Sequence, residues 1–187
     1  MAAPAQISGM ASFLDPSSVR REVLSNGLTV LLRRDTSAPV VAIVTHVNAG
    51  YFDETDDVSG IAHVLEHMFF KGTARRGVGD ISKETKSSGG YLNAHTIYDQ
   101  TVYFTVLPSS GFAAGLDIQS DAYANSAIDA EELRKELEVI IQEAKRKSDN
   151  PSALATETLY EILHDRHRMR RWRIGHEKDC ACSIVTR

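Results

Sequence analysis

The chain has 187 residues and a formal net charge of −4, with 42% hydrophobic and 25% charged residues. These values are typical of a globular protein of about one domain, and they argue against nucleic acid as a partner. Cys180 and Cys182 are the only cysteines and lie near the end of the sequence. A disulfide framework or a cysteine-rich zinc site is therefore excluded for the body of the chain.

The first residues and the lengths of the apolar runs bear on the cellular location of the protein. Residues 1–18 are small and polar, which predicts a flexible lead, and they lack the basic and apolar regions of a secretory signal. No run approaches the roughly 18 apolar residues of a membrane-spanning helix. We therefore expect a cytoplasmic protein without a membrane partner.

The first predicted elements are β-strands. Two β-favouring runs, 20–25 and 28–34, flank Asn26-Gly27, a dipeptide that tolerates the positive φ angles of a type I′ hairpin turn. Residues 40–47 form a near-continuous β-branched run, which predicts a strand buried on both faces. The acid-rich segment 48–58 that follows is expected to be a solvated loop rather than a cation site.

Helices dominate the second half of the chain. In chain order the expected elements are a short helix at 80–88, strands at 91–96 and 101–107, and helices at 110–126, 129–147 and 151–164. Asp129 with Glu132 resembles a capping box, and Asn150-Pro151 is typical of a new helix start. Strands first and helices after, with one early helix crossing the sheet, predict an α+β two-layer sandwich of a mainly antiparallel sheet packed by helices.

That early helix, expected at 59–71, carries the residues that point to a chemical function. It contains His63-Val-Leu-Glu66-His67, so that the two imidazoles leave one helix face a turn apart and can bind one divalent ion. Glu66 lies beside them and can take a proton from a metal-bound water. Ser59 is the expected N-cap. The stripe expected to pack on the core is apolar: Ile61, Ala62, Leu65, Met68 and Phe69.

Two histidines leave a catalytic zinc site incomplete, because such a site usually takes three protein ligands. The helix at 129–147 offers Glu136, Glu138 and Glu143 as further candidates. Glu136 and Glu143 are two turns apart on one face, and Glu143 lies beside apolar residues, where a carboxylate without a partner is costly. Periodicity alone does not choose among the three.

The sequence HVLEHMFFKGT, which begins at His63, resembles the signature of the insulinase/pitrilysin family of zinc metallopeptidases, including the mitochondrial processing peptidases. In that family the third ligand is a glutamate at a fixed distance after the second histidine, and Glu143 lies at that distance. The resemblance implies one Zn²⁺ per chain, held by His63, His67 and Glu143, with Glu66 as the general base. A second family glutamate matches Glu136, which implies that Glu136 orients a histidine ligand.

The resemblance also implies a substrate and a partner. Asn93 and Ala94, followed by 99–103, resemble the family's edge strand and its neighbour, which implies that an extended peptide pairs along this edge. Family members contain two or more homologous domains, so a second homologous domain or subunit is expected. We expect a mitochondrial-processing-peptidase-like domain at 19–176, incomplete at its C-terminal end, and a tail at 177–187 outside the family.

Other functions are less well supported. A fragment of a two-domain peptidase, or a non-catalytic binding or scaffold subunit, remains an alternative, although inactive family partners typically lose motif residues that are present here. S-ribosylhomocysteine lyase shares the His-x-x-Glu-His pattern but takes a cysteine ligand from the domain body, unlike Cys180 or Cys182. The basic cluster at 166–173 is expected to be a solvated face or domain contact rather than a nucleic-acid site. We therefore expect a zinc metalloendopeptidase that is weak or inactive without its second domain.

Overall fold

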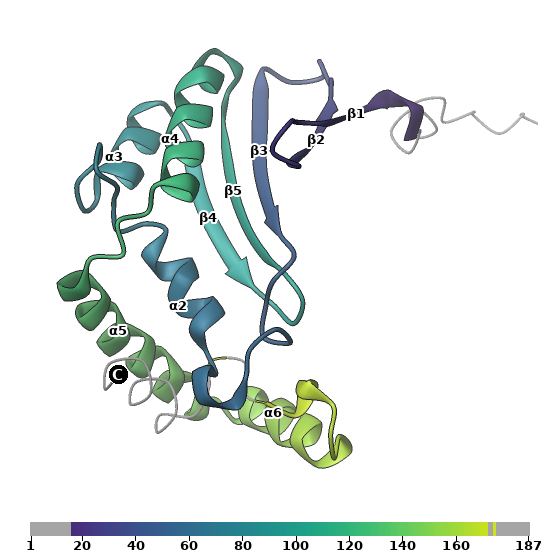
Figure 1. The fold of residues 1–187 in the computed structure, drawn as a ribbon, viewed down its shortest axis with the longest axis vertical. Coiled ribbons are helices and arrows are strands. Elements are labelled where there is room, and N and C mark those ends of the chain that lie inside the picture. The colour runs from purple at the N-terminus through teal and green to yellow at the C-terminus, as the bar shows by residue number, and fades with distance from the viewer. Residues whose placement is uncertain (1–15, 172–173, 175–187) are drawn as a thin grey trace, which may run out of the picture. The chain divides into compact units, whose positions relative to one another are not determined.

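The computed structural model describes residues 16–171 and residue 174. The chain divides into two compact units, Met1–Pro39 and Val40–Arg187, which are described separately below. The expectations for most of the N-terminal lead, for the tail at 177–187 and for the two cysteines lie outside the described residues. The elements of both units are labelled in Figure 1.

The first unit is a β-hairpin. It consists of a short 3-10 turn at Pro16–Ser18, strand β1 (Val19–Val23) and strand β2 (Thr29–Arg33), which pair antiparallel. The hairpin is confirmed, but the type I′ turn is wrong. Gly27 has a φ of 87°, whereas Asn26 does not have a positive φ. The amide of Gly27 donates to the carbonyl of Leu24, so the chain reverses over four residues before Gly27 leads into the second strand.

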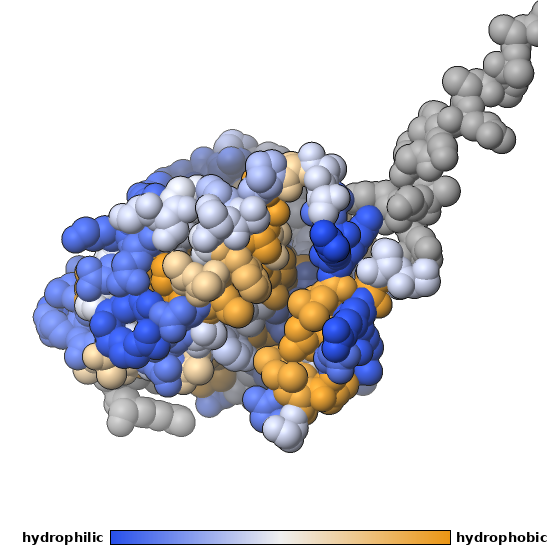
Figure 2. All heavy atoms as spheres, turned by 90° about the horizontal axis from the view of Figure 1, so that it is seen from above, coloured by the Kyte–Doolittle hydropathy of each residue, from blue (hydrophilic) through white to orange (hydrophobic). Residues whose placement is uncertain are grey.

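The second unit contains an antiparallel sheet of three strands. These are β3 (Val40–Val47), β4 (Tyr91–Thr96) and β5 (Thr101–Pro108), in the order β3-β5-β4. Side chains along β3 alternate between half-buried and exposed, so the prediction of a strand buried on both faces is wrong. β-branched residues also occupy the open face: Val40 is 55% and Val44 is 59% exposed. Figure 2 shows that apolar side chains, in orange, reach the surface in several places.

The helices pack on one face of this sheet and on one another. They are α2 (Ile61–Met68), α3 (Asp80–Ser87), α4 (Phe112–Ala124), α5 (Ala130–Ser148) and α6 (Pro151–Leu163). Short 3-10 turns lie at Asp56–Val58, Ser109–Gly111 and Arg168–Arg170. Helices α2 and α3 pack on β4, α4 packs on β5 and β3, α5 packs on α2, and α6 packs on α5 (Figure 1). The predicted α+β architecture of sheet and helices is therefore confirmed.

Two side-chain caps fix where the long helices begin. The carboxylate of Asp129 accepts from the amides of Glu131 and Glu132, and the side chain of Asn150 accepts from the amides of Ser152 and Ala153. Each cap satisfies amide groups that have no partner within the helix. The predicted starts of α5 and α6 are thus confirmed.

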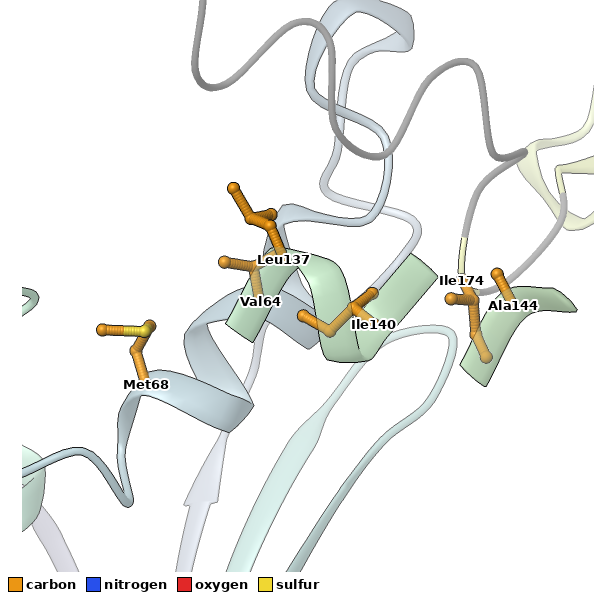
Figure 3. Close-up of a cluster of buried hydrophobic side chains, with 6 residues drawn as sticks. All are labelled: Val64, Met68, Leu137, Ile140, Ala144 and Ile174. Atoms are coloured by element: carbon orange, nitrogen blue, oxygen red, sulfur yellow. The ribbon is translucent and has the colours of Figure 1, made fainter. Parts of the chain in front are cut away.

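The core of the second unit has two parts. One lies between α2 and α5 and contains Val64, Met68, Leu137, Ile140, Ala144 and Ile174 (Figure 3). The other lies between the sheet and the helices and contains Phe69, Ile81, Tyr103, Ile118 and Ala122. The predicted apolar stripe of α2 was partly wrong, because Leu65 is 47% exposed and Val64 is buried instead. Val64 and Met68 lie one turn apart, so α2 is buried on the side that faces α5.

None of the described helices is both long enough and apolar enough to span a bilayer.

Candidate metal centre

Helix α2 begins differently from the sequence-based expectation. Gly60, with a φ of 93°, is at the N-cap position, and no side chain at that position caps the helix. The carboxylate of Glu54 instead accepts from the amides of Gly60 and Ala62. Ser59 is therefore not the N-cap, and Glu54, which is 5% exposed, is not part of a solvated acidic loop. Two backbone donors at the positive end of the helix hold this buried carboxylate in place.

Three side chains from α2 and α5 converge at one point. Nε2 of His63 lies 3.9 Å from Oε1 of Glu143, and Nε2 of His67 lies 3.7 Å from Oε2 of Glu143. One ligand atom from each of the three side chains lies within 4.8 Å of the others. The structure therefore brings together the three residues that the resemblance implied, from positions far apart in the sequence.

The chemistry of this donor set fits zinc. Two imidazole nitrogens and one carboxylate oxygen form a usual catalytic zinc set, in which bonds of about 2.1 Å put ligand atoms roughly 3.4 Å apart. The separations to Glu143 are a few tenths of an ångström larger, which small side-chain rotations can close. Burial lowers the pKa of His63 to about 4, with His67 and Lys147 adding to the effect. His63 is consequently a neutral imidazole near pH 7, the form that binds metal.

Glu136 contacts the ring nitrogen of His67 that does not face Glu143. Its Oε2 lies 3.4 Å from Nδ1 of His67, and its other oxygen pairs with Nζ of Lys71. Glu136 is 7% exposed, so it is not a solvent-facing helix acid. When Nδ1 of His67 donates to Glu136, the lone pair of Nε2 is directed toward the point where the three ligand atoms converge. Lys71 was missed by the sequence reasoning, although it lies one turn after His67, the spacing that would have placed it on this face.

Nδ1 of His63 has a different environment. It is the one buried side-chain nitrogen or oxygen that lacks a hydrogen-bond partner within the part of the chain that the structure describes. The rings of His63 and His67 meet edge to face, with centroids 4.6 Å apart. His63 is thus positioned by packing, and His67 by a hydrogen bond.

Glu66 lies beside the two histidines and contacts the sheet. Its Oε2 accepts a hydrogen bond of 2.6 Å from the hydroxyl of Thr96, at the end of β4. Burial raises the pKa of Glu66 above its ordinary value, while the Thr96 hydroxyl and the nearby His67 oppose the rise. Thr96 was also missed, since no sequence pattern relates a strand-end threonine to a helix carboxylate.

The two residues expected to bind substrate, Asn93 and Ala94, lie on the edge strand β4. The side chain of Asn93 is exposed and donates to the hydroxyl of Tyr91, and its oxygen accepts from the amide of Ala94. Ala94 is half-buried and packs against the core beneath the sheet. The hydrogen bonds of Asn93 are therefore internal to β4 rather than directed at the ligand cluster.

The basic segment near the end of the described residues makes contacts within the chain. Arg171 donates to the backbone carbonyl of Glu54, and Arg170 donates to the backbone carbonyl of Asp165. Arg173 lies outside the described residues. The Arg171 contact connects this basic segment to the loop that caps α2, which agrees with a structural role for the segment.

Comparisons with known proteins identify the same family throughout. Residues 29–175 match the family described as Insulinase (Peptidase family M16). The chain is 41% identical over 137 residues to an uncharacterized zinc protease of Rickettsia bellii, covering 73% of this chain and 33% of that protein. It is 36% identical over 130 residues to a probable mitochondrial-processing peptidase subunit beta of Arabidopsis thaliana, covering 70% and 24%.

Solved structures agree with this result. A protease from Helicobacter pylori superimposes with a TM-score of 0.83 at 26% identity, over 87% of this chain and 39% of that one. A peptidase M16 inactive domain from Pseudomonas fluorescens has the same fold, with a TM-score of 0.79 at 19% identity over 88% and 40%. The chain thus spans about a quarter to two fifths of the length of these proteins. On the sequence match and the shared fold together, the chain belongs to the insulinase family of peptidases, peptidase family M16.

Proposed function

We propose that this chain is the metal-bearing part of a zinc metallopeptidase that hydrolyses peptide bonds. His63, His67 and Glu143 hold one Zn²⁺ in this proposal, and Glu66 is the catalytic base. The observation that carries it is the convergence of three ligand atoms within 4.8 Å of one another, contributed by two helices. Glu66 lies on the same helix as both histidines, one residue before His67.

The roles of the side chains follow from their positions and charges. Zinc bound at this site supplies a Lewis acid that polarises a carbonyl oxygen and makes a water molecule more acidic. Glu66 accepts a proton from the attacking water and later donates it to the leaving amine. Burial of Glu66 raises its pKa, which brings the carboxylate closer to the range in which it can both take and return a proton. Glu136 keeps His67 in the tautomer and orientation that a ligand needs.

The proposed substrate is an extended peptide that adds to the sheet along β4. Among the strands that the structure describes, β4 pairs on one side only, with β5, so its other edge offers main-chain donors and acceptors. Asn93 and Ala94 are the proposed contact residues. Binding through main-chain hydrogen bonds places few demands on side chains, so we expect a preference for unfolded segments over one sequence.

The proposed partner is a second homologous domain or subunit that completes the cleft. The names of the relatives support this, since the Arabidopsis protein is described as a subunit and the chain spans only 24% of it. We therefore expect slow hydrolysis by this chain alone. Fast hydrolysis by the purified 187-residue chain would contradict the need for a partner.

The test compares the wild-type chain with Glu66→Gln. Both are loaded with one equivalent of zinc and incubated with an internally quenched, unstructured peptide, with and without a chelator. We expect both proteins to retain zinc, and we expect chelator-sensitive hydrolysis that falls by about 10²–10⁴-fold in the variant, the usual contribution of a general base. Measurable, chelator-sensitive hydrolysis that is equal in the two proteins would overturn the role of Glu66. A wild-type chain that binds no zinc would overturn the proposed function.

A further inference from the structure

Thr96 connects the end of the edge strand to the carboxylate of Glu66. Its hydroxyl donates to Oε2 over 2.6 Å, and the residue is 9% exposed. A short hydrogen bond from a hydroxyl to a carboxylate is among the stronger kinds in proteins, and burial removes competing water. The contact therefore fixes one of the two carboxylate oxygens.

The direction of this hydrogen bond follows from the neighbouring hydroxyl and from the carboxylate itself. Oγ1 of Thr96 also lies 3.4 Å from Oγ1 of Thr101, its partner in the β4–β5 register. Thr101 already donates to the backbone carbonyl of Ala49 over 2.9 Å. Because a hydroxyl has a single proton, that of Thr101 is committed to Ala49 and does not reach Thr96. The ionised carboxylate of Glu66 can only accept, so Thr96 is the donor in its contact with Glu66.

The two oxygens of Glu66 are consequently different. Oε2 is held by Thr96, whereas Oε1 accepts no hydrogen bond from any residue that the structure describes. A general base needs one oxygen within hydrogen-bond reach of the proton that it removes, with the carboxylate held at a fixed angle. An arrangement with one fixed oxygen and one free oxygen meets this need.

The position of Thr96 in β4 relates the base to the proposed substrate edge. Leu92, Ala94 and Thr96 lie on the strand face turned toward the helices, while Asn93 and His95 alternate with them on the open face. The hydroxyl is thus two residues from Ala94 on one short strand. The same strand would therefore position both a peptide that pairs with this edge and the carboxylate that acts on that peptide.

We propose that Thr96 is a positioning residue for Glu66. The hydroxyl of Thr96 holds Oε2 of Glu66, so that Oε1 of Glu66 faces the attacking water. This inference rests on the proposed function and adds to it a residue that lies outside the metal-binding motif. Thr96 touches neither substrate nor metal in this proposal and acts only through Glu66.

The test uses the zinc-loaded 187-residue chain with Thr96→Val, which keeps the shape but removes the hydroxyl, and Thr96→Ser, which keeps the hydroxyl. Thr85→Val is the matched control, because Thr85 is also buried and its hydroxyl donates to the carbonyl of Ile81 within α3. Four quantities are measured: kcat and KM for the quenched peptide, the Kd for zinc, and the NMR order parameter of the Glu66 side chain.

We expect Thr96→Val to lower kcat by about 10- to 100-fold, the scale of a misplaced catalytic group, with KM and the zinc Kd within about twofold. The order parameter of Glu66 should fall in the same variant. Thr96→Ser should restore kcat to within about threefold together with the order of Glu66, and Thr85→Val should change neither. Thr96→Ala provides a second hydroxyl-free variant if Thr96→Val does not fold.

An ordered Glu66 in the hydroxyl-free variants would overturn the inference, as would an equal loss of kcat in Thr96→Ser and Thr96→Val. These outcomes are distinct from failure of the proposed function, which would appear as absent zinc binding or as measurable hydrolysis that is equal in Glu66→Gln and wild type. The order parameter decides the role of Thr96 even if the chain alone hydrolyses the peptide too slowly to measure.

Discussion

Oε2 of Glu136 on α5 lies 3.4 Å from Nδ1 of His67 on α2, while the other oxygen of Glu136 pairs with Lys71, one turn further along. One buried carboxylate therefore contacts α2 at two points on the face that carries the proposed ligands. The orientation of His67 depends in this way on how closely α5 packs against α2. The apolar contacts of Val64 and Met68 with Leu137 and Ile140 maintain that packing.

Glu136→Ala should weaken zinc binding. Without the carboxylate, His67 loses the acceptor for Nδ1, and Lys71 loses its ion-pair partner in a mostly buried position. Removal of such an outer partner typically weakens metal binding by about 10- to 100-fold. Competition with a chromophoric chelator measures the Kd. Glu138→Ala is the control, because the side chain of Glu138 is 71% exposed on the same helix; equal Kd values for the two variants would contradict the account.

Glu54→Ala should destabilise the second unit. The buried carboxylate accepts from two amides at the start of α2, and its removal leaves both donors without that partner. We expect a loss of about 1–3 kcal/mol in the free energy of unfolding, by analogy with lost helix caps and unsatisfied buried donors. Urea denaturation measures it, with Glu138→Ala expected to change stability by less than about 0.5 kcal/mol. A Glu54 variant as stable as wild type would show that Glu54 does not cap the helix.

The carboxylate of Asp121 should make stability depend on acid pH. Hydrogen bonds from Asn125 above all, and then from Thr73 and Arg76, lower the pKa of Asp121 from 3.8 to about 2. A pKa that is lower in the folded state contributes stability above the unfolded value, and this contribution disappears as the pH falls from about 4 to 2. The thermal midpoint of wild type should therefore fall more steeply over that range than the midpoint of Asp121→Asn. Parallel curves for the two proteins would contradict this origin.

Part of the candidate site could be predicted from the sequence because the helical period determines it. His63 and His67 are four residues apart, and Glu136 and Glu143 are seven apart, so each pair shares a face in any regular helix. Periodicity did not separate these glutamates from Glu138. The structure does, because Glu136 and Glu143 approach the histidines, while the side chain of Glu138 points to solvent.

The remaining contacts depend on tertiary structure that no local pattern encodes. Glu54 is one acid in an acid-rich loop, and nothing in that run indicates which carboxylate turns inward to cap α2. The expectation for Ser59 failed because the chain turns through Gly60 at positive φ. Thr96 reaches Glu66 only because β4 lies against α2, a pairing of elements far apart in the sequence. The open face of β3 was misjudged because β-branched residues favour strands whether or not a second layer covers them.

The most direct test of the central claim is the zinc affinity of the purified chain beside that of Glu143→Ala. Elemental analysis after dialysis and chelator competition give the stoichiometry and the Kd, with Glu138→Ala as the control on the same helix. The account predicts one zinc per wild-type chain, a Kd unchanged in Glu138→Ala, and binding weakened by about 100-fold or more in Glu143→Ala, which keeps only two protein ligands. Equal zinc content and equal Kd in wild type and Glu143→Ala would contradict it.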